Sequence, residues 1–393
     1  MKAIHILFAF LLTILSGTSC IAAAEMPIIA YWGVPDYRIT DADFRTFREC
    51  GFTVSLFPYT SLDVLVTACR VAHRNGVQIL GQCPEMFNSP VQTAKKLSGE
   101  SGFYGYFLQD EPNAHDMRQQ HSLIERLQSA DANHRFYINL LPCYDPIQSA
   151  SMTKTTSYDE YLRVASALPC QQLSFDFYPV RKDGLRSTWY HNLEMVRQES
   201  IASGKPFWGF VLSCPHADYP QPTMATLRLQ VYANLAYGAQ AIQYFTYWTP
   251  APNKTYDFHN APISQKGKKT KTYALVQQMN RELRAVAPLF FGAKTTSVSH
   301  LGKVAAGTSR LVTPPVNISK LNIQSREGAI VSELEKDSHR YLVIVNKDYR
   351  HSMKVLVTPK TSLPRHITKE LKEQPVAESY TVGAGDMLLF KLQ

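Results

Sequence analysis

The amino-acid sequence predicts an α/β protein, a (β/α)8 TIM barrel followed by a small C-terminal antiparallel β-sandwich. The chain has 393 residues, which suits a barrel of typical size plus one smaller module. From residue 27 to about 292, short apolar runs alternate with amphipathic stretches, as is typical of parallel strands joined by crossover helices. After residue 293 the pattern changes to short alternating runs separated by turn residues.

The barrel strands are predicted from eight apolar runs, at residues 28–32, 53–57, 77–81, 105–108, 136–140, 172–175, 206–211 and 241–245. The clearest helical patterns between them lie at residues 62–73, 116–129, 190–202, 224–236 and 272–287. Barrel active sites form at the carboxyl ends of the strands. The residues expected there are Trp32, Tyr59, Glu85, Asp110, Glu111, Asn139, Tyr144, Asp176, Tyr178, Ser213, His216, Tyr247 and Trp248.

The domain boundaries follow from these patterns. We expect a catalytic barrel over residues 25–292 and a β-sandwich over 293–393, with the junction near Gly292. The sandwich strands are predicted at residues 328–332, 341–345, 354–357 and 386–391.

The N-terminus has the pattern of a signal peptide over residues 1–24. Lys2 precedes an apolar run at residues 4–15, and small residues follow up to Ala24. Two processing routes fit this pattern, which are cleavage after Ala24 and lipidation of Cys20. The protein is therefore expected to be secreted or periplasmic, either free or as a lipoprotein tethered to a membrane through Cys20.

Charge and cysteine spacing argue against two other classes of protein. The net charge of +9 comes from 41 basic and 32 acidic residues spread along the chain, without the basic arm of a nucleic-acid-binding protein. The cysteines form no CxxC pair and no metal-ligand spacing. We expect no nucleic-acid partner, no metal and no organic cofactor.

The strongest chemical signal is the segment Gly-Tyr-Phe-Leu-Gln-Asp-Glu-Pro at residues 105–112. An apolar strand delivers Asp110 and Glu111 into a strand-to-helix turn. Cleavage of a glycosidic bond needs a proton donor, and a carboxyl with apolar neighbours and a second nearby negative charge can serve as one. The alternative is that the two acids only cap the following helix.

Three segments resemble a known group of enzymes. Residues 105–112 resemble the Asn-Glu-Pro motif that ends strand four in clan A glycoside hydrolases, with Asp110 in place of Asn. Residues 174–179, Ser-Phe-Asp-Phe-Tyr-Pro, resemble a stretch of the family forty-two β-galactosidases, and residues 243–248 resemble the aromatic eighth strand of the clan. The resemblance implies that Glu111 is the general acid/base and that Trp248 is a platform for the sugar.

The sequence departs from clan A at strand seven. That clan places its nucleophilic Glu there, but residues 206–216 contain no carboxylate, and the next acid is Asp218. Three residues could compensate. Asp110 could orient the substrate's own acetamide, as in hexosaminidases with an Asp-Glu pair, or Asp176 or Glu85 could supply the opposing carboxylate. The direct adjacency to Glu111 favours Asp110, whereas Asp176 and Glu85 could equally be structural loop acids.

The predicted function is hydrolysis of a β-linked sugar, galactoside-like or N-acetylhexosaminide-like, in an oligosaccharide or polysaccharide. Trp32, Tyr178, Tyr247 and Trp248 are suited to stack on a sugar ring, although rings within strands also build barrel cores. Glu85, Asn139 and His216 complete the predicted substrate-binding residues. A non-catalytic carbohydrate-binding barrel is the alternative from a different class.

Overall fold

The computed structural model describes residues 25–393. The predicted signal peptide and Cys20 therefore lie outside the described residues. Within residues 25–393, no helix is both long and apolar enough to cross a membrane.

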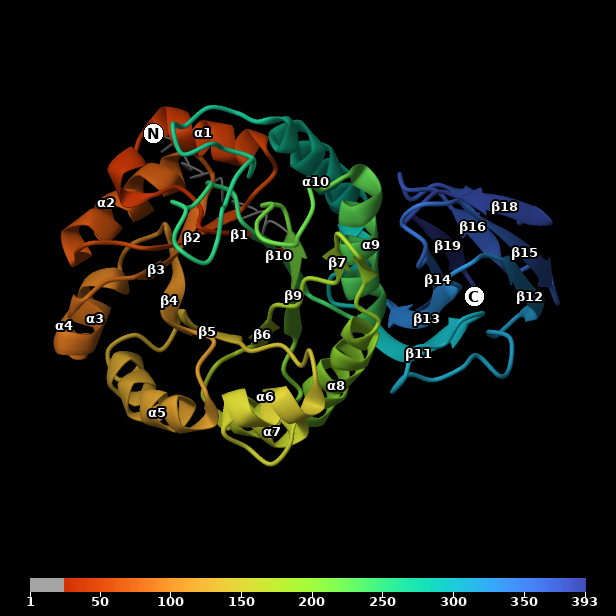
Figure 1. Cartoon of the computed structure of the whole chain (residues 1–393), viewed down its shortest axis with the longest axis horizontal. Helices are drawn as coiled ribbons and strands as arrows, with labels where there is room; N and C mark the ends of the chain where they lie inside the picture. Colours follow the sequence, from red (N-terminus) through yellow and green to blue (C-terminus); the bar gives the residue numbers. More distant parts are fainter. Residues whose placement is uncertain (1–24) are drawn as a thin grey trace, which may run out of the picture.

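Eight parallel strands close into a barrel, which confirms the predicted fold class (Figure 1). Each strand pairs with its neighbour in the chain order of the barrel, and β10 closes the ring by pairing Ile242 with Ile28. The barrel strands are β1 (Ile28–Tyr31), β2 (Val54–Pro58), β3 (Gln78–Gln82), β4 (Phe103–Asp110), β5 (Arg135–Leu140), β6 (Leu173–Phe175), β9 (Phe207–Leu212) and β10 (Ala241–Phe245).

Helices surround the barrel, and most of them begin at a residue whose side chain caps the first turn. Ser61 accepts a hydrogen bond from the Val64 amide, and Asn113 caps the helix that follows Glu111. The helices are η1 (Asp36–Arg38), α1 (Asp41–Glu49), α2 (Leu62–Arg74), α3 (Glu85–Asn88), α4 (Pro90–Leu97), α5 (Ala114–Gln128), α6 (Pro146–Thr153), α7 (Tyr158–Ala167), α8 (Thr188–Ser203), α9 (Met224–Tyr237) and α10 (Lys271–Phe290).

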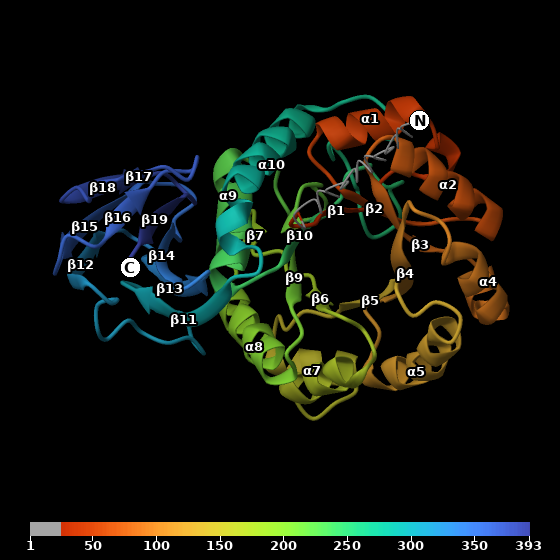
Figure 2. The same cartoon turned by 180° about the vertical axis from the view of Figure 1, so that it is seen from behind.

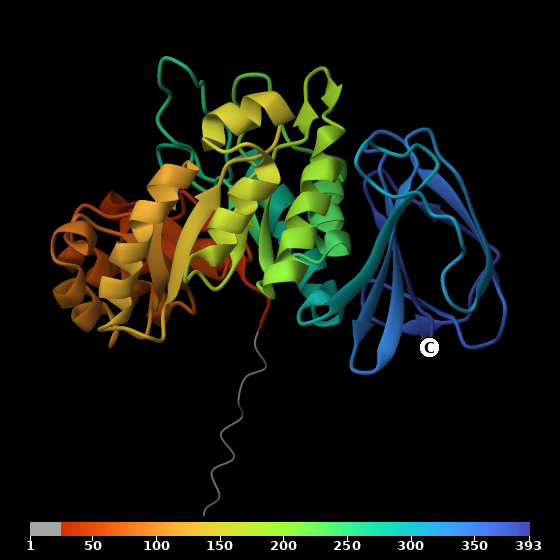
Figure 3. The same cartoon turned by 90° about the horizontal axis from the view of Figure 1, so that it is seen from below.

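A short hairpin interrupts the βα alternation between β6 and α8. It consists of β7 (Val180–Arg181) and β8 (Gly184–Leu185), which pair in antiparallel register. Figure 3 shows the barrel from the side, with this hairpin and the loops at the carboxyl ends of the strands along its upper edge.

The C-terminal region is a β-sandwich of two antiparallel sheets, as predicted. Their facing sides enclose a core that includes Leu321, Val331, Ile344, Val355 and Phe390. One sheet contains β11 (Lys294–Leu301), β13 (Ala329–Lys336), β14 (His339–Asn346), β19 (Met387–Lys391), β16 (Arg365–Ile367) and β17 (Glu373–Gln374). The other contains β12 (Ile318–Gln324), β15 (Met353–Pro359) and β18 (Ser379–Val382).

The larger sheet of the sandwich packs its outer face on the barrel helix α9 (Figures 1 and 2). Side chains alternate along each strand, so Val331 faces the sandwich core while Ile330 joins the barrel core. Helix α9 is consequently buried on nearly all of its sides. A helix that is apolar all round belongs in the interior of a protein, and here the barrel and the sandwich supply that interior together.

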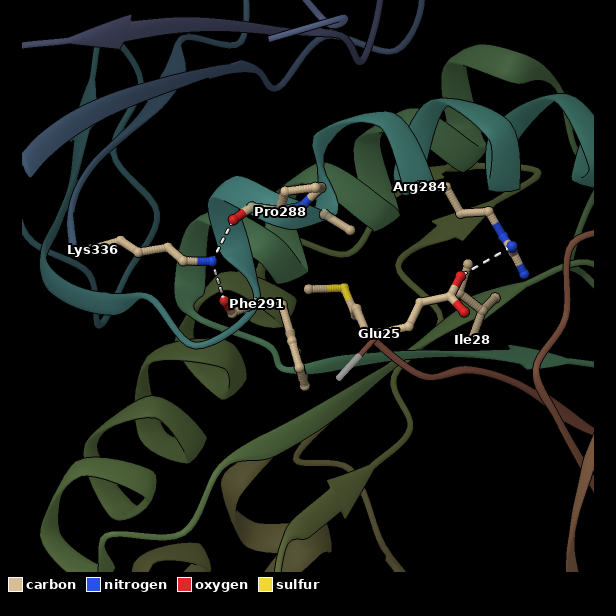
Figure 4. Close-up of a pocket in the computed structure, with 8 residues that line it drawn as sticks. Glu25, Ile28, Arg284, Pro288, Phe291 and Lys336 are labelled. Carbon is tan, nitrogen blue, oxygen red and sulfur yellow. Dashed lines mark hydrogen bonds and ion pairs between the residues drawn. The ribbon is translucent and has the colours of Figure 1, made fainter. Parts of the chain in front are cut away.

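Polar contacts also join the two modules. Arg228 of α9 and Lys369 of the sandwich both pair with Glu282 of α10, with N–O distances of 2.6 and 3.0 Å. At the amino end of the barrel, Lys336 of β13 donates hydrogen bonds to the carbonyls of Pro288 and Phe291 (Figure 4).

Candidate active site

A cavity of about 390 Å³ opens at the carboxyl ends of the barrel strands. It is assembled from segments that follow β1, β4, β5, β6, β9 and β10, which is where barrel enzymes place their active sites. The described residues that line it are Tyr31, Asp110, Glu111, Asn139, Leu141, Pro142, Tyr144, Met152, Asp176, Tyr178, Arg186, Phe210, His216, Tyr219, Phe245, Tyr256 and Phe258.

Asp110 and Glu111 both face this cavity although they are adjacent in the chain. In a regular strand, successive side chains point to opposite faces. Here the register of β4 against β5 shifts between Phe107 and Gln109, and Glu111 has a φ of 45°. The left-handed conformation at Glu111 changes the direction of its side chain. A non-glycine residue held in this region costs about 1–3 kcal/mol, and such strain concentrates at functional sites.

Asn139 joins two of the three carboxylates. Its Nδ2 group donates to Asp110 at 3.2 Å and to Asp176 at 3.0 Å, so it holds the ends of β4 and β6 together. The Oδ1 atom of Asn139 accepts a hydrogen bond from the buried Ser174 hydroxyl at 3.1 Å. That hydroxyl also accepts from Gln243 of β10, at 2.8 Å. The carboxylates therefore rest on a buried polar network that fixes the amide of Asn139.

Glu111 has the electrostatic character of a general acid. Burial raises its pKa, and the negative charge of Asp110 raises it further, while a hydrogen bond with Asp176 works in the opposite direction. The result is a pKa of about 7. Glu111 is open to solvent inside the cavity, but the surrounding walls remove most of the water that would stabilise its charge.

The two aspartates differ in environment. Burial raises the pKa of Asp110, and hydrogen bonds from Tyr31 and Asn139 oppose the rise. Asp176 is only 8% exposed, and burial followed by the charges of Glu111 and Asp110 raises its pKa well above the ordinary value. Hydrogen bonds from Asn139 and Tyr178 stabilise the ionised form of Asp176.

Aromatic rings form most of the remaining wall. His216 is buried among four of them, with ring centroids 4.9 Å from both Tyr219 and Phe258. Burial lowers the pKa of His216, so the ring is neutral near pH 7. Its Nδ1 lies 2.9 Å from the Cys214 carbonyl, which can only accept, so Nδ1 carries the proton and Nε2 is an acceptor.

Six of the predicted site residues meet in the cavity: Asp110, Glu111, Asn139, Asp176, Tyr178 and His216. The other four predicted residues are absent from its described lining, and their contacts explain why.

Glu85 begins helix α3 and accepts a hydrogen bond from the Leu62 amide at 3.1 Å, which ties it to the start of α2. Trp32 packs edge to face on Phe57, with ring centroids 5.0 Å apart. Both residues thus make structural contacts between the first three βα units.

Tyr247 and Trp248 also lie outside the cavity. Tyr247 is 1% exposed and packs against Phe47 of α1 at 4.8 Å between ring centroids. Trp248 is 4% exposed and is covered by Tyr37 and by the Arg38 guanidinium, which lies 5.4 Å from the ring centroid. The sugar platform expected from strand eight is therefore core.

Several cavity residues were not among the predicted site residues. They come mainly from loops, and Tyr144 was recognised only as a strand-end residue. Tyr31 and Phe245 are the last residues of β1 and β10, where a ring could equally belong to the barrel core. The loop residues have no distinguishing signal in the sequence, because a side chain in a loop gives no indication of its direction. These residues are Tyr31, Tyr144, Arg186, Tyr219, Phe245, Tyr256 and Phe258.

Strand seven, β9, contributes no carboxylate to the described lining. The residue that follows it is Ser213, whose hydroxyl donates to the Thr246 carbonyl at 2.8 Å. Asp218 is paired with Arg181 of the β7–β8 hairpin and does not line the cavity. Across residues 25–393 there is no cluster of three or more His, Cys, Asp or Glu residues arranged to hold a metal ion.

Comparison with known proteins agrees with this architecture. Residues 104–286, from β4 through most of α10, match the β-galactosidase family Glyco_hydro_42. No curated protein matches the chain in sequence.

Solved structures show the same fold at low sequence identity. A GH42 β-galactosidase from G. stearothermophilus is 7% identical with a TM-score of 0.64, covering 94% of this chain and 98% of the other. The β-galactosidase from Bacillus circulans sp. alkalophilus is 10% identical with a TM-score of 0.61, covering 92% and 98%. One from the haloarchaeon Halorubrum lacusprofundi is 11% identical with a TM-score of 0.52, covering 94% and 99%.

The family match and the carboxylates at the ends of β4 and β6 support the same assignment. The chain is a glycoside hydrolase with a clan A type barrel, and it resembles the family forty-two β-galactosidases.

Proposed function

We propose that this protein hydrolyses terminal β-galactosides with retention of configuration, with Glu111 as general acid/base and Asp176 as nucleophile. One observation carries the proposal: Glu111 and Asp176 line the same cavity, where Asn139 donates hydrogen bonds both to Asp176 and to Asp110, the neighbour of Glu111 in the chain.

The separation between the carboxyl groups of Glu111 and Asp176 distinguishes a retaining from an inverting mechanism. Inverting glycosidases keep their carboxyl groups about 6.5–9.5 Å apart to admit a water molecule, whereas retaining enzymes hold them about 5–5.5 Å apart. The hydrogen bond from Asp176 that lowers the pKa of Glu111 places the two carboxyls beside each other, which favours the shorter, retaining separation over the inverting one. Asp176 therefore takes the part that a strand-seven Glu plays in clan A, from the neighbouring strand β6.

The chemistry proceeds in two steps. Protonated Glu111 donates its proton to the glycosidic oxygen as the bond from that oxygen to C1 breaks, and an Asp176 oxygen bonds to C1. Glu111, now ionised, removes a proton from water, and the water oxygen attacks C1. The bond from Asp176 to C1 then breaks, and both carboxyls return to their starting states.

Asn139 and Tyr178 act on the nucleophile. Both donate hydrogen bonds to Asp176, and they stabilise its negative charge before attack and after release. These donors oppose burial and the charges of Glu111 and Asp110, which raise the pKa of Asp176 and favour the protonated carboxyl, a poor nucleophile.

The cavity suits a small glycone. Its volume of about 390 Å³ lies near the lower end of the range for small-molecule sites, about 300–1,000 Å³. The rings of its wall can cover the apolar face of one sugar, and His216 Nε2 can accept from a hydroxyl. The family match supports a galactoside, and the small cavity supports removal of a terminal residue.

Asp110 supports a second candidate, substrate-assisted hydrolysis of an N-acetylhexosaminide. Asp110 is more exposed in the cavity than Asp176, and it lies next to Glu111 in the chain. In that mechanism Asp110 would orient the acetamide and stabilise its developing positive charge.

The test is hydrolysis of 4-nitrophenyl β-galactoside, its α-anomer, 4-nitrophenyl N-acetyl-β-glucosaminide and a β-galactosyl disaccharide. Glu111→Gln should lower kcat on the disaccharide by about 10²–10⁴-fold while galactose binding survives, because an amide keeps the shape but cannot donate the proton. Glu125→Gln, an exposed change on α5, is the matched control and should behave as the native protein does.

Near-native activity of Glu111→Gln would refute the assignment of the acid. Sugar binding without turnover of any substrate by the native protein would instead support the non-catalytic carbohydrate-binding alternative.

Export of the protein is also proposed, on the pattern of residues 1–24. Intact mass of the protein from cells would distinguish cleavage after Ala24 from lipidation, and Cys20→Ala should release a lipidated form from the membrane fraction. Retention of residues 1–24 in the cytoplasm would contradict the proposal.

A further inference from the structure

Arg186 is the only Lys or Arg among the described residues that line the cavity. It directly follows the β7–β8 hairpin, and its amide donates to the Pro179 carbonyl at 2.9 Å, which anchors the backbone at the site rim. The basic run at residues 266–271 contributes nothing to this lining.

The guanidinium of Arg186 is held in place by two tyrosines. It lies over the Tyr144 ring at 4.4 Å from the centroid, and its Nη1 donates to the Tyr219 hydroxyl at 3.3 Å. Tyr144 and Tyr219 come from different loops, after β5 and β9. Stacking of this kind fixes the guanidinium plane before any ligand arrives.

Arg186 has no carboxylate partner among the described residues, since none lies within 4.0 Å of its nitrogens. Arg181, five residues earlier, differs in this respect, because it is paired with Asp218 and, at 3.4 Å, with Asp183. Arg186 is also not paired with Asp110, Glu111 or Asp176, so neutralising the catalytic carboxyls does not explain its position.

The free donors at this position suit an anion. A guanidinium has five N–H donors, and only one of those on Arg186 has a hydrogen-bond partner in the described residues. The Tyr219 hydroxyl accepts from Arg186 and has no acceptor among the described residues, so its own proton is free to donate to a ligand. Planar, fixed donors of this kind match the two oxygens of a carboxylate or a sulfate group.

We infer that Arg186, Tyr144 and Tyr219 form a subsite for an acidic group of the substrate, a uronic acid carboxylate or a sulfate ester on a sugar. This inference rests on the proposed glycosidase function and adds a substrate class to it. The enzyme then prefers acidic glycosides to neutral ones of the same shape.

The test compares kcat/KM for three substrates that differ in one group: 4-nitrophenyl β-galactoside, 4-nitrophenyl β-galacturonide and 4-nitrophenyl β-galactoside 6-sulfate. The measured quantity is the ratio of each acidic substrate to the neutral one. The native enzyme should give a ratio above one for at least one acidic substrate. The substrate with that ratio shows whether the subsite binds a carboxylate or a sulfate.

Substitution of Arg186 should remove the preference. Arg186→Gln should lower the ratio about 10- to 100-fold, which is the range for losing a hydrogen bond to a charged group. Arg186→Lys keeps the charge without the planar stack and should keep part of the preference. Arg181→Gln removes a nearby positive charge outside the cavity and should leave the ratio unchanged.

A native ratio of one or less for both acidic substrates would overturn the inference, as would an unchanged ratio in Arg186→Gln. If Arg186→Gln does not fold, as judged by its thermal unfolding, the Arg186→Lys ratio decides instead.

If no glycoside is hydrolysed, the proposed function fails. Calorimetric binding of galacturonate against galactose, with native protein and the Arg186 variants, then still tests the subsite.

Discussion

Glu111 and Asp176 occupy a site where two neighbouring negative charges are unfavourable. Burial and proximity to other carboxyls raise the pKa of each, and the hydrogen bond between them is best made when one is protonated. Since the pKa of Glu111 is about 7, the proton on it is available for the leaving group below neutral pH.

The pH dependence of activity follows from this pair. Only protonated Glu111 can act as acid, so kcat/KM for a β-galactosyl disaccharide should fall as pH rises through about 7. It should also fall at lower pH, where Asp176, whose pKa is raised, takes up a proton and can no longer attack. The fall should be shallower for 4-nitrophenyl β-galactoside, whose leaving group needs less protonation. An activity that keeps rising from pH 6 to pH 9 would contradict the role of Glu111.

Substitution of the two aspartates separates the two mechanisms. If Asp176 is the nucleophile, Asp176→Asn should nearly abolish galactoside turnover. Azide should then partly restore the turnover of the Asp176→Ala variant, because it can attack C1 from the space that the carboxylate left. Asp110→Asn should then cost less, because Asp110 supports the site through its hydrogen bonds with Tyr31 and Asn139 and does not react with the sugar.

The opposite ranking would favour substrate assistance. A sharp loss in Asp110→Asn, confined to N-acetylated substrates, together with a mild effect of Asp176→Asn, would replace the nucleophile proposed here with the substrate's own acetamide.

At the scale of elements, two loops build the aromatic wall of the cavity together. The β9–α9 loop carries His216 and Tyr219, and the β10–α10 loop carries Tyr256 and Phe258. One side-chain hydrogen bond between these two loops is made by Asp257, whose Oδ1 accepts from the Ala217 amide at 2.6 Å. Ala217 has a φ of 47°, so this hydrogen bond holds a strained backbone next to His216.

Loss of this hydrogen bond should weaken substrate binding more than chemistry. Asp257→Ala removes a hydrogen bond of about 1 kcal/mol, and KM should rise about fivefold while kcat changes little. Asp63→Ala, an exposed change at the start of α2, is the control for charge. A large fall in kcat with an unchanged KM would show that Asp257 does more than hold the loops.

At the scale of the whole molecule, the sandwich completes the barrel. The outer face of α9 packs against β13 and β14, and the Tyr237 hydroxyl lies 2.9 Å from Nε2 of His300 in β11. Burial alone would raise the pKa of Glu282, but hydrogen bonds and charges from Arg228, Lys369 and Tyr232 lower it to about 2. This carboxylate therefore stays ionised at the junction over the ordinary pH range.

Truncation after Gly292 should consequently give poorly soluble protein. It would expose the apolar outer face of α9 and leave Glu282 without Lys369. Soluble yield and binding of a hydrophobic dye measure the effect. Lys369→Met in the full chain keeps the sandwich and should remain soluble. A stable, fully active fragment of residues 25–292 would show that the barrel does not need the sandwich.

The sequence by itself determined the barrel, the sandwich and the acid pair of strand four. Strand and helix periods are local properties, and eight alternations leave few other folds. Asp110 ends a strand, and Glu111 and Asp176 directly follow one; they could be located because all strands of a parallel barrel end on one face.

Only the tertiary structure decided which rings line the cavity. Trp32, Tyr247 and Trp248 follow strands as well, but they turn into contacts with a neighbouring strand, helix or loop. Tyr256 and Phe258 reach the cavity from a long loop instead. The direction of a side chain beyond a strand end depends on bulges, left-handed residues and loop packing. These arise from contacts between segments far apart in the chain, and local sequence does not encode them.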